Sequence, residues 1–492
     1  MLYAGSSAAR AWALWLTVAI VCVEAIWIIA VPPFRGIDEF DHAYRADYVA
    51  RGNWERPTSP VTDGRGAAVT VRESLVAAAR PVCASFEYTG PDNCRPRRSD
   101  DGLATVATGA FAYDSTYYWL IGTPALAFEG TGALLIMRVV SSLMCALVIA
   151  IASVMLRRAF GPRPVIGLLI ALTPTVAYTF SILGPNGLEI AAGAASWAGL
   201  LALARQHETM ERVNVWLLAT AGCCAILSVL RPLGPLWLFM IAAFTLVANG
   251  WRPWTELARR SPVALAGAVA LVVAAVLVAA RGVLQVQPGA FIPGDIGLPD
   301  NGWAVVRDQF PVWVFQTVAA FPSRDEAAPM AVYALHMGVL GTWIAAGTYA
   351  SRGRLRIALI GVVIASLVVP VIIAAELLGP LALGWQGRYA LPFAVGGTVV
   401  AGVALIPAPV GRRLGRVAFA LGALALLAAQ LISAVTVYSR QLSIPEVRES
   451  GWPFLPVWTL ALMAGFAAMA IGLSSRAASR ATDAEALSRT DL

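Results

Sequence analysis

The chain has 492 residues, of which 58% are hydrophobic and only 13% are charged. A soluble protein of this length would carry about a quarter charged residues, so the composition excludes that class and predicts an integral membrane protein. The formal net charge of +7 comes from arginines spread between apolar segments, which indicates a topology signal and argues against nucleic acid as a partner.

Apolar runs long enough to cross a bilayer recur along the whole chain. The first of them is too long for the core of a signal peptide and has no clear cleavage site, so we interpret it as a retained span. We expect an all-α polytopic fold with about twelve transmembrane helices by the length criterion. The runs that predict them are 12–31, 132–156, 164–183, 188–204, 213–230, 233–249, 262–280, 329–350, 357–378, 389–407, 417–438 and 454–473.

Arginines concentrate in every second connection between these runs. Because basic connections stay in the cytoplasm, this alternation predicts that both termini are cytoplasmic. The long loops 32–131 and 281–328 are then extracytoplasmic. We expect one integral membrane domain over 1–473 and a disordered cytoplasmic tail over 474–492, which is small and polar.

A cluster of three carboxylates and one imidazole follows the first run, at Asp38, Glu39, Asp41 and His42. Ionisable groups are costly near a bilayer and are usually kept there for function. If the next residues form a helix that ends at Gly52, then Asp38, Asp41 and His42 share a face and Glu39 turns away. The alternative is that Asp38 and Glu39 merely cap this helix. A divalent cation at Asp38 is a further alternative that so short a cluster does not specify.

Two cysteines, Cys83 and Cys94, lie in the first long loop, whereas the other four fall inside apolar runs. The residues between the two include Gly and Pro and close easily, and an extracytoplasmic compartment is oxidising. We therefore predict a disulfide between them. A metal pair is the less favoured alternative, because no matching His or Cys cluster accompanies them.

Transferase chemistry outside the cell cannot draw on nucleotide sugars, and the chain has no Walker A or dinucleotide motif. A polyprenyl-phosphate sugar donor would need a carboxylate to take the acceptor proton and cations to hold the departing phosphate. Asp38 is the candidate base. Arg388 and Arg231 are candidate phosphate ligands because both lie at outer ends of predicted spans. Asn186 is either a further ligand or an ordinary turn residue.

Two segments carry a family resemblance. The Asp-Glu-Phe-Asp-His segment 38–42 resembles an Asp-Glu-x-x-His motif that the DUF2142 family of predicted membrane proteins has after its first span. The segment 385–392, Trp-Gln-Gly-Arg-Tyr-Ala-Leu-Pro, is similar to the family's Gln-Gly-Arg-Tyr motif. Phe40 stands where the family usually has proline, so the geometry of this loop could differ.

DUF2142 in turn resembles the GT-C glycosyltransferases. The resemblance implies a GT-C-like bundle, a large first extracytoplasmic loop with short helices, and transfer from a polyprenyl-phosphate-linked sugar to a cell-envelope glycan or lipid. It places Asp38 at the base position and Glu39 beside it. The residues expected at the donor phosphate or substrate are Arg388, Arg231, Gln386, Tyr389, His42, Asn186 and Trp385.

Two alternatives to this function are a transporter or flippase of lipid-linked sugars and a glycan polymerase or ligase. A transporter typically carries polar residues deep in several spans and an internal repeat. This chain concentrates its ionisable groups at the outer mouth instead, which favours the glycosyltransferase. The absence of lysine and the abundance of Ala, Arg and Gly are typical of a GC-rich bacterial genome, so we expect a bacterial cytoplasmic membrane.

Overall fold

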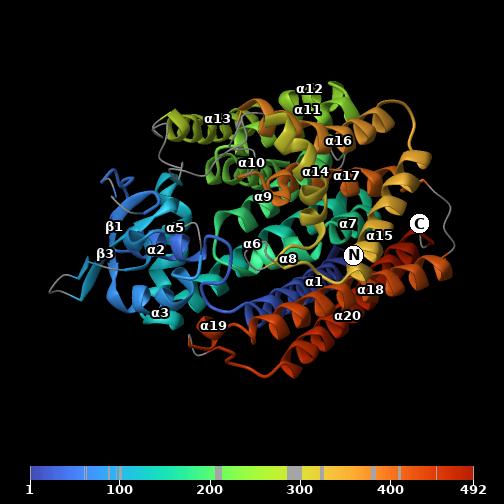
Figure 1. Cartoon of the computed structure of the whole chain (residues 1–492). Helices are drawn as coiled ribbons and strands as arrows, with labels where there is room; N and C mark the ends of the chain where they lie inside the picture. The colour runs from blue at the N-terminus through green and yellow to red at the C-terminus, as the bar shows by residue number, and fades with distance from the viewer. Residues whose placement is uncertain are drawn as a thin grey trace.

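The computed structural model is mostly helical, with one small sheet at one side of the bundle, at the left in Figure 1. The residues that the structure describes are 2–59, 61, 64–86, 89–95, 97–98, 102–205, 213–284, 302–321, 326–377, 384–407, 412–449 and 452–490.

Nine helices within the described ranges are long and apolar enough to cross a membrane, which confirms the multi-span fold. Their apolar cores match nine of the predicted runs. The helices are α1 (Leu2–Ala30), α6 (Gly130–Phe160), α9 (Pro185–Arg205), α10 (Val213–Leu230), α13 (Pro262–Leu284), α15 (Met330–Ala350), α16 (Gly353–Ile372), α18 (Arg412–Gln441) and α20 (Trp458–Thr490).

Two bent helix pairs raise the number of spans to eleven if each pair is one span. One is α7 (Pro162–Ile170) with α8 (Pro174–Ser181), bent by 79°, and the other is α11 (Gly234–Asn249) with α12 (Arg252–Arg260), bent by 104°. The predicted run 389–407 contains only α17 (Leu391–Ala404), a buried helix of 14 residues. It is therefore shorter than a full crossing, because the segment before Leu391 turns into a 3-10 helix at the candidate site.

The break between α7 and α8 has a clear local cause. Pro174 begins α8, and the Thr173 side chain caps it by accepting a hydrogen bond from the Val176 amide at 3.2 Å. The backbone carbonyls freed by the break are covered from other helices, since Gln430 Nε2 donates to the Leu172 carbonyl at 3.0 Å. The break turns α8 so that the chain after it, at the start of α9, reaches the first long loop.

The first long loop folds into a small domain beside the helix bundle, called the outer domain because it lies outside the bundle. It contains the predicted short helices and also an unpredicted sheet. Its elements are α2 (Glu39–Ala50), β1 (Ala67–Arg72), α3 (Glu73–Cys83), α4 (Pro91–Cys94), β2 (Arg97–Arg98), β3 (Leu103–Thr108), the 3-10 helix η1 (Gly109–Ala112) and α5 (Ser115–Ala125). The sheet is antiparallel in the order β1-β3-β2, and β1 pairs with β3 from Ala67 opposite Thr108 to Arg72 opposite Leu103. The fold is mostly helical as expected, and this sheet is an addition to the predicted all-α bundle. The strands are short, and β1 and β3 pair across a long stretch of intervening chain, which local sequence patterns do not reveal.

The outer domain shares one continuous apolar core with the helix bundle. Val71 and Leu75 of the outer domain and Met137 and Ile149 of α6 are all buried in this core. The side chains at the junction are therefore held on packed elements rather than on free loops.

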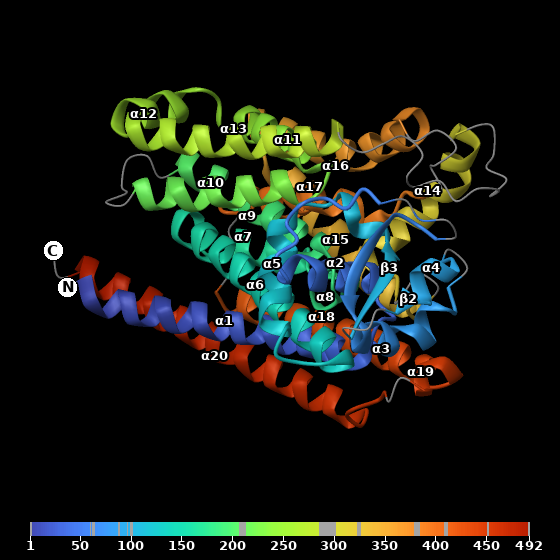
Figure 2. The same ribbon diagram turned by 90° about the vertical axis from the view of Figure 1, so that its left-hand side faces the viewer.

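Helices α1 and α20 run side by side along one edge of the molecule, with both termini at the same end of the pair (Figure 2). Ser474 Oγ donates to the Trp12 carbonyl at 3.3 Å, which links them. The backbone of α20 is helical as far as Thr490, whereas the sequence predicts disorder from Ser474 onward.

The remaining elements are short or lie between spans. They are α14 (Gly302–Val318), the π-helical turn η2 (Ile373–Leu377), the 3-10 helix η4 (Gly387–Ala390) and α19 (Pro445–Glu449). Within the predicted loop 281–328, residues 285–301 and 322–325 lie outside the described residues. η4 holds the second sequence motif and leads directly into α17.

Candidate active site

Asp38 lies at the start of α2 in a tight turn. Its φ of 56° is left-handed, as is the φ of 61° at the buried Phe34 four residues earlier. Non-glycine residues adopt this region rarely, although Asp tolerates it better than most, and strained backbone of this kind clusters at functional sites. The Asp38 side chain makes no capping hydrogen bond to α2, so helix capping does not explain it.

The Asp38 carboxylate lies between two arginines from distant parts of the chain. Arg65 Nη2 is 3.1 Å from its Oδ1, and Arg388 Nη2 is 4.0 Å from its Oδ2. Burial raises the pKa of this carboxyl, but the positive charges of Arg65 and Arg388 outweigh burial and lower the pKa to about 2. Its side chain is 29% exposed, so an ionised and reachable carboxylate stands at the mouth of the bundle.

Asp41 shares this face of α2, as the helical spacing predicts. Its carboxylate pairs with Arg65 and accepts a hydrogen bond from the Gly109 amide at 2.6 Å, and Thr108 Oγ1 donates to its backbone carbonyl at 2.8 Å. Burial raises the pKa of Asp41, although the charge of Arg65 opposes the shift. Asp41 therefore ties α2 to the end of β3 while it shares a guanidinium with Asp38.

Glu39 points the other way and is not brought to Asp38. Both of its oxygens accept from Arg138 of α6 at 2.6 Å, and the Leu183 amide donates to it at 3.0 Å. Arg138 also donates to the carbonyls of Val31 and Pro32, each at 2.7 Å. This fully buried pair closes the turn after α1, which is the arrangement of a structural ion pair.

His42 lies one turn along α2 from Asp38. Its Nδ1 is 2.8 Å from the Tyr118 hydroxyl, and the two rings stack. Gly184 lies so close to the other edge of the imidazole that a β-carbon there would sit 3.2 Å from the ring, so glycine permits the approach. Burial lowers the pKa of His42 to about 3, although the charge of Asp38 opposes the shift, so the ring is neutral near pH 7.

Arg388 and Arg231 meet at Asn186. With the amide oriented to satisfy both donors, the Asn186 oxygen accepts from Arg388 Nε at 3.0 Å and from Arg231 Nη1 at 2.8 Å. Arg231 also lies 3.6 Å from Glu189 Oε2 and stacks over the Tyr389 ring at 4.3 Å. Two guanidinium groups are thus concentrated in a buried position, and among the described residues Glu189 is the one carboxylate within 4 Å of Arg231. Asn186 acts as the bridge between them and not only as a turn residue.

The rest of the second motif packs around these arginines. Gly387 lies so close to α14 that a β-carbon would clash with the Trp313 carbonyl, and its amide donates to Gln316 Oε1 at 2.9 Å. Trp385 is buried against Trp313 and Tyr389, so it supports the motif by packing. Gln386 Oε1 is buried with no hydrogen-bond partner among the described residues.

A small cavity lies where α2, α8, α9 and η4 meet. Its lining combines a cation and an imidazole with apolar side chains, so polar and hydrocarbon surfaces meet there. The residues that line it are Ile37, His42, Thr179, Ile182, Leu183, Gly184, Asn186 and Arg388. The structure thus brings six predicted site residues close together, namely Asp38, His42, Asn186, Arg231, Arg388 and Tyr389.

Sequence reasoning missed Arg65, which pairs with Asp38 and Asp41, and Tyr118, which contacts His42. Arg65 lies in an irregular stretch, and its Gly-Arg-Gly context carries no recognisable motif. Arg138 was also missed, although a single arginine in the apolar run 132–156 is an intramembrane charge that needs a partner.

The residues near Asp38 do not present a ready cation site. A divalent ion at Asp38 would need the carboxylates of both Asp38 and Asp41 as ligands. Arg65 already pairs with both of them. Within the described ranges, no three His, Cys, Asp or Glu side chains are grouped to hold a metal ion. We therefore derive no step through a metal.

Cys83 and Cys94 are joined by a disulfide, as the sequence predicts, with their Cα atoms 5.6 Å apart. The bond links the end of α3 to the end of α4. The other four cysteines are free.

A protein-family profile described as a predicted membrane protein (DUF2142) matches residues 21–396. No protein of curated function matches the chain. Among solved structures, the chain is similar to ArnT from Cupriavidus metallidurans in the apo state, at 16% identity and a TM-score of 0.44 over 95% of this chain and 77% of that one. It is also similar to ArnT bound to undecaprenyl phosphate, at 16% identity and a TM-score of 0.43, over 97% and 79% of the two chains. The Archaeoglobus fulgidus oligosaccharyltransferase in the apo form matches at 14% identity and a TM-score of 0.43, over 87% of this chain and 56% of that one.

Proposed function

The chain belongs to the DUF2142 family of predicted membrane proteins, and we propose that it is a membrane glycosyltransferase. It transfers a sugar from a polyprenyl-phosphate donor to a cell-envelope glycan or lipid acceptor on the extracytoplasmic side. The observation that carries this proposal is the meeting of Asp38 with Arg388, and of Arg388 with Asn186 and Arg231, at a point where Arg388 and Asn186 also line a small cavity.

The arginines supply what a phosphate leaving group needs. As the bond between the sugar anomeric carbon and the phosphate oxygen breaks, the electron pair stays on the phosphate and increases its negative charge. Arg388 and Arg231 are fixed by Asn186 before any ligand binds, so their donors need little reorganisation as this charge develops. The apolar side of the cavity, at Ile37 and Ile182, would adjoin the first carbons of the prenyl chain.

Asp38 would take the proton of the acceptor hydroxyl while the acceptor oxygen bonds to the anomeric carbon. A carboxylate with a pKa of about 2 is a weak base, because its neighbours already stabilise its charge. Donor binding would change this balance. The singly charged phosphodiester of the donor beside Arg388 offsets part of the guanidinium charge that Asp38 feels, which raises the pKa of Asp38 and strengthens the base when the donor is present.

His42 and Glu39 have supporting roles in this proposal. Burial raises the pKa of Tyr118, so its hydroxyl stays protonated and can donate to His42 Nδ1. The neutral imidazole then carries its proton on Nε2, the edge that faces Gly184 and the cavity, and offers a donor to the phosphate or sugar. Glu39 acts through Arg138 by holding the turn that presents Asp38.

Two observations favour a flippase of lipid-linked sugars as the second candidate. Glu24 is buried inside α1, and neither of its oxygens has a hydrogen-bond partner among the described residues. An intramembrane carboxyl of this kind is typical of a substrate or proton path. The broken pair α7 and α8 is also a feature that transporters use at binding sites.

The test uses the purified full chain in liposomes with a radiolabelled polyprenyl-phosphate sugar and a panel of acceptor lipids and glycans. We expect release of polyprenyl phosphate, transfer of label to an acceptor, and loss of both in Asp38→Asn. A Glu24→Gln variant is the matched control and should keep transfer. Movement of intact donor across the bilayer that depends on Glu24, with no release of phosphate from any donor, would replace the enzyme with the flippase.

A further inference from the structure

We propose that Arg65 is a positioning residue for Asp38, held in place by Asn93 and by the disulfide-bridged segment next to it. It fixes one carboxylate oxygen of Asp38 so that the other faces Arg388 and the cavity. This inference rests on the proposed function in one respect only, that Asp38 is the base.

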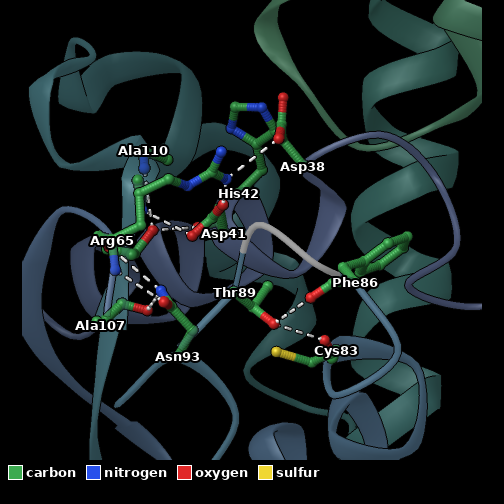
Figure 3. A network of polar contacts seen from close by, with 12 residues as sticks. Asp38, Asp41, His42, Arg65, Cys83, Phe86, Thr89, Asn93, Ala107 and Ala110 are labelled. Carbon is green, nitrogen blue, oxygen red and sulfur yellow. Dashed lines mark hydrogen bonds and ion pairs between the residues drawn. The ribbon is translucent and has the colours of Figure 1, made fainter. Parts of the chain in front are cut away.

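Arg65 reaches Asp38 from outside the helix bundle. Its Nη2 is 3.1 Å from Asp38 Oδ1 and also pairs with Asp41, so one nitrogen bridges two carboxylates one helical turn apart (Figure 3). Asp41 is itself fixed by the Gly109 amide at 2.6 Å. Asp41, whose side chain is buried, therefore holds the guanidinium of Arg65 beside Asp38.

Asn93 fixes the backbone from which Arg65 extends. Its Oδ1 accepts from the amide of Arg65 at 2.8 Å, and its Nδ2 donates to the carbonyl of Arg65 at 3.2 Å. The same amide group bonds to the Gly90 amide at 3.2 Å and the Ala107 carbonyl at 3.0 Å. This fully buried side chain thus makes two hydrogen bonds to the backbone of Arg65 and one each to Gly90 and Ala107, which hold Arg65 between α4 and β3.

The disulfide anchors this clamp to the domain core. Asn93 is followed directly by Cys94, which is bonded to Cys83 at the end of α3. Thr89 Oγ1 adds hydrogen bonds to the carbonyls of Cys83 at 3.0 Å and Phe86 at 2.8 Å, on the same side (Figure 3). The short α4 therefore has little freedom to move, and its Asn93 transmits this restraint to Arg65.

The two oxygens of Asp38 consequently differ. Oδ1 is within hydrogen-bond distance of Arg65, whereas Oδ2 is 4.0 Å from Arg388, too far for a hydrogen bond, and so is available to an acceptor hydroxyl. A base that must take a proton in one direction benefits from a fixed carboxylate plane.

The charged and titratable groups that face Asp38 are few and come from several elements. They are Arg65 before β1, Arg388 of η4, Asp41 and His42 of α2, and Tyr113 before α5. Arg65 and Arg388 are the cations that lower the pKa of Asp38. Removal of Arg65 should therefore raise the pKa of Asp38. Removal of an arginine that has only a structural role far from this carboxylate should not raise it.

A hydrophobic carbodiimide provides a test that does not depend on any enzymatic reaction, because it modifies only protonated carboxyls. The full chain in detergent would be labelled from pH 4 to pH 8, and adduct at Asp38 quantified by peptide mass spectrometry. Wild-type Asp38 should label very little over this range. Arg65→Gln should label increasingly as the pH falls, since each unit of pKa increase raises the protonated fraction about tenfold while the group is mostly ionised.

Three further variants separate positioning from general loosening. Arg65→Lys keeps the charge and should restore most of the resistance to labelling. Asn93→Ala should give an intermediate increase, because it frees the backbone and not the charge. Arg72→Gln is the matched control: it breaks a partly buried arginine pair in the same domain, with Asp47 at 2.6 Å, and should leave Asp38 unlabelled.

Equal labelling of Asp38 in wild type and Arg65→Gln would overturn the proposal, and so would an increase in Arg72→Gln as large as that in Arg65→Gln. The outcome is separate from the proposed function. A protein that transfers no sugar but shows the expected labelling would retain the Arg65 clamp while losing the glycosyltransferase assignment.

Discussion

Asp38 and Glu39 are neighbours in one motif, yet they lie in opposite environments. Glu39 is fully buried, and both of its carboxylate oxygens accept hydrogen bonds from Arg138 and from backbone amides. Asp38 is partly exposed, and one of its oxygens is held while the other faces an arginine too distant for a hydrogen bond. A carboxylate with complete partners holds structure, whereas one with spare capacity beside a cavity can act on a ligand.

The largest expected difference between Asp38 and Glu39 is in sugar transfer, and the Asp38→Asn variant tests it. Removal of a general base typically costs about 10²- to 10⁴-fold in turnover, and the amide is nearly the same size as the carboxylate. We expect that loss in sugar transfer, measured with labelled donor, and little change in the unfolding temperature in detergent. Retention of full transfer would show that Asp38 is not the base.

Glu39→Gln should show the reverse pattern. It leaves Arg138 buried without a counter-ion, and breaking such a pair costs about 3–5 kcal/mol. We expect a lower unfolding temperature, measured by circular dichroism in detergent. Any loss of transfer should follow from loss of folded protein, so activity per folded molecule should change far less than in Asp38→Asn. A large fall in that normalised activity at unchanged stability would make Glu39 catalytic instead.

Arg388→Lys probes the partner that faces Asp38 across the cavity. Lysine keeps the charge but cannot bond Asn186 in the same geometry while it also faces a phosphate. Loss of one charge-assisted hydrogen bond, worth about 1.5–3 kcal/mol, corresponds to roughly 10- to 100-fold weaker donor binding. The measurement is a binding titration with undecaprenyl phosphate. Arg307→Gln, which breaks an exposed pair with Asp308, serves as the control and should bind like wild type.

The smallest effect should come from pH. Asp38, with a pKa near 2, stays ionised and His42, with a pKa near 3, stays neutral from pH 5 to pH 8. Undecaprenyl phosphate affinity should therefore show no step from either group in that window. The pKa of Asp38 is lower in the folded protein than its unfolded value of about 3.9. Asp38 therefore stabilises the folded state above that pH, and the stabilisation is lost as the pH falls toward 2. A step in affinity between pH 6 and 7 that disappears in His42→Gln would contradict the neutral imidazole.

Much of the fold could be predicted because the length of an apolar run depends only on consecutive residues in the sequence. The apolar runs predict nearly every spanning helix, and the cysteine spacing predicts the disulfide. The small sheet, the short α17 and the bend between α7 and α8 could not be predicted in the same way. Each depends on partners far along the chain, such as β3 for β1 and Gln430 for the carbonyl of Leu172.

The candidate site likewise has one part that the sequence predicts and another that only the tertiary structure reveals. The two sequence motifs alone single out Asp38 and Arg388, because charged residues are expensive beside a membrane and these occur in recognisable contexts. Only the tertiary structure decides that Asn186 joins Arg388 to Arg231, that Glu39 belongs to Arg138, and that Arg65 holds Asp38. The physical reason is that the sequence specifies which residues carry charge, while the role of each charge depends on the distances to its neighbours, which come from segments up to several hundred residues away.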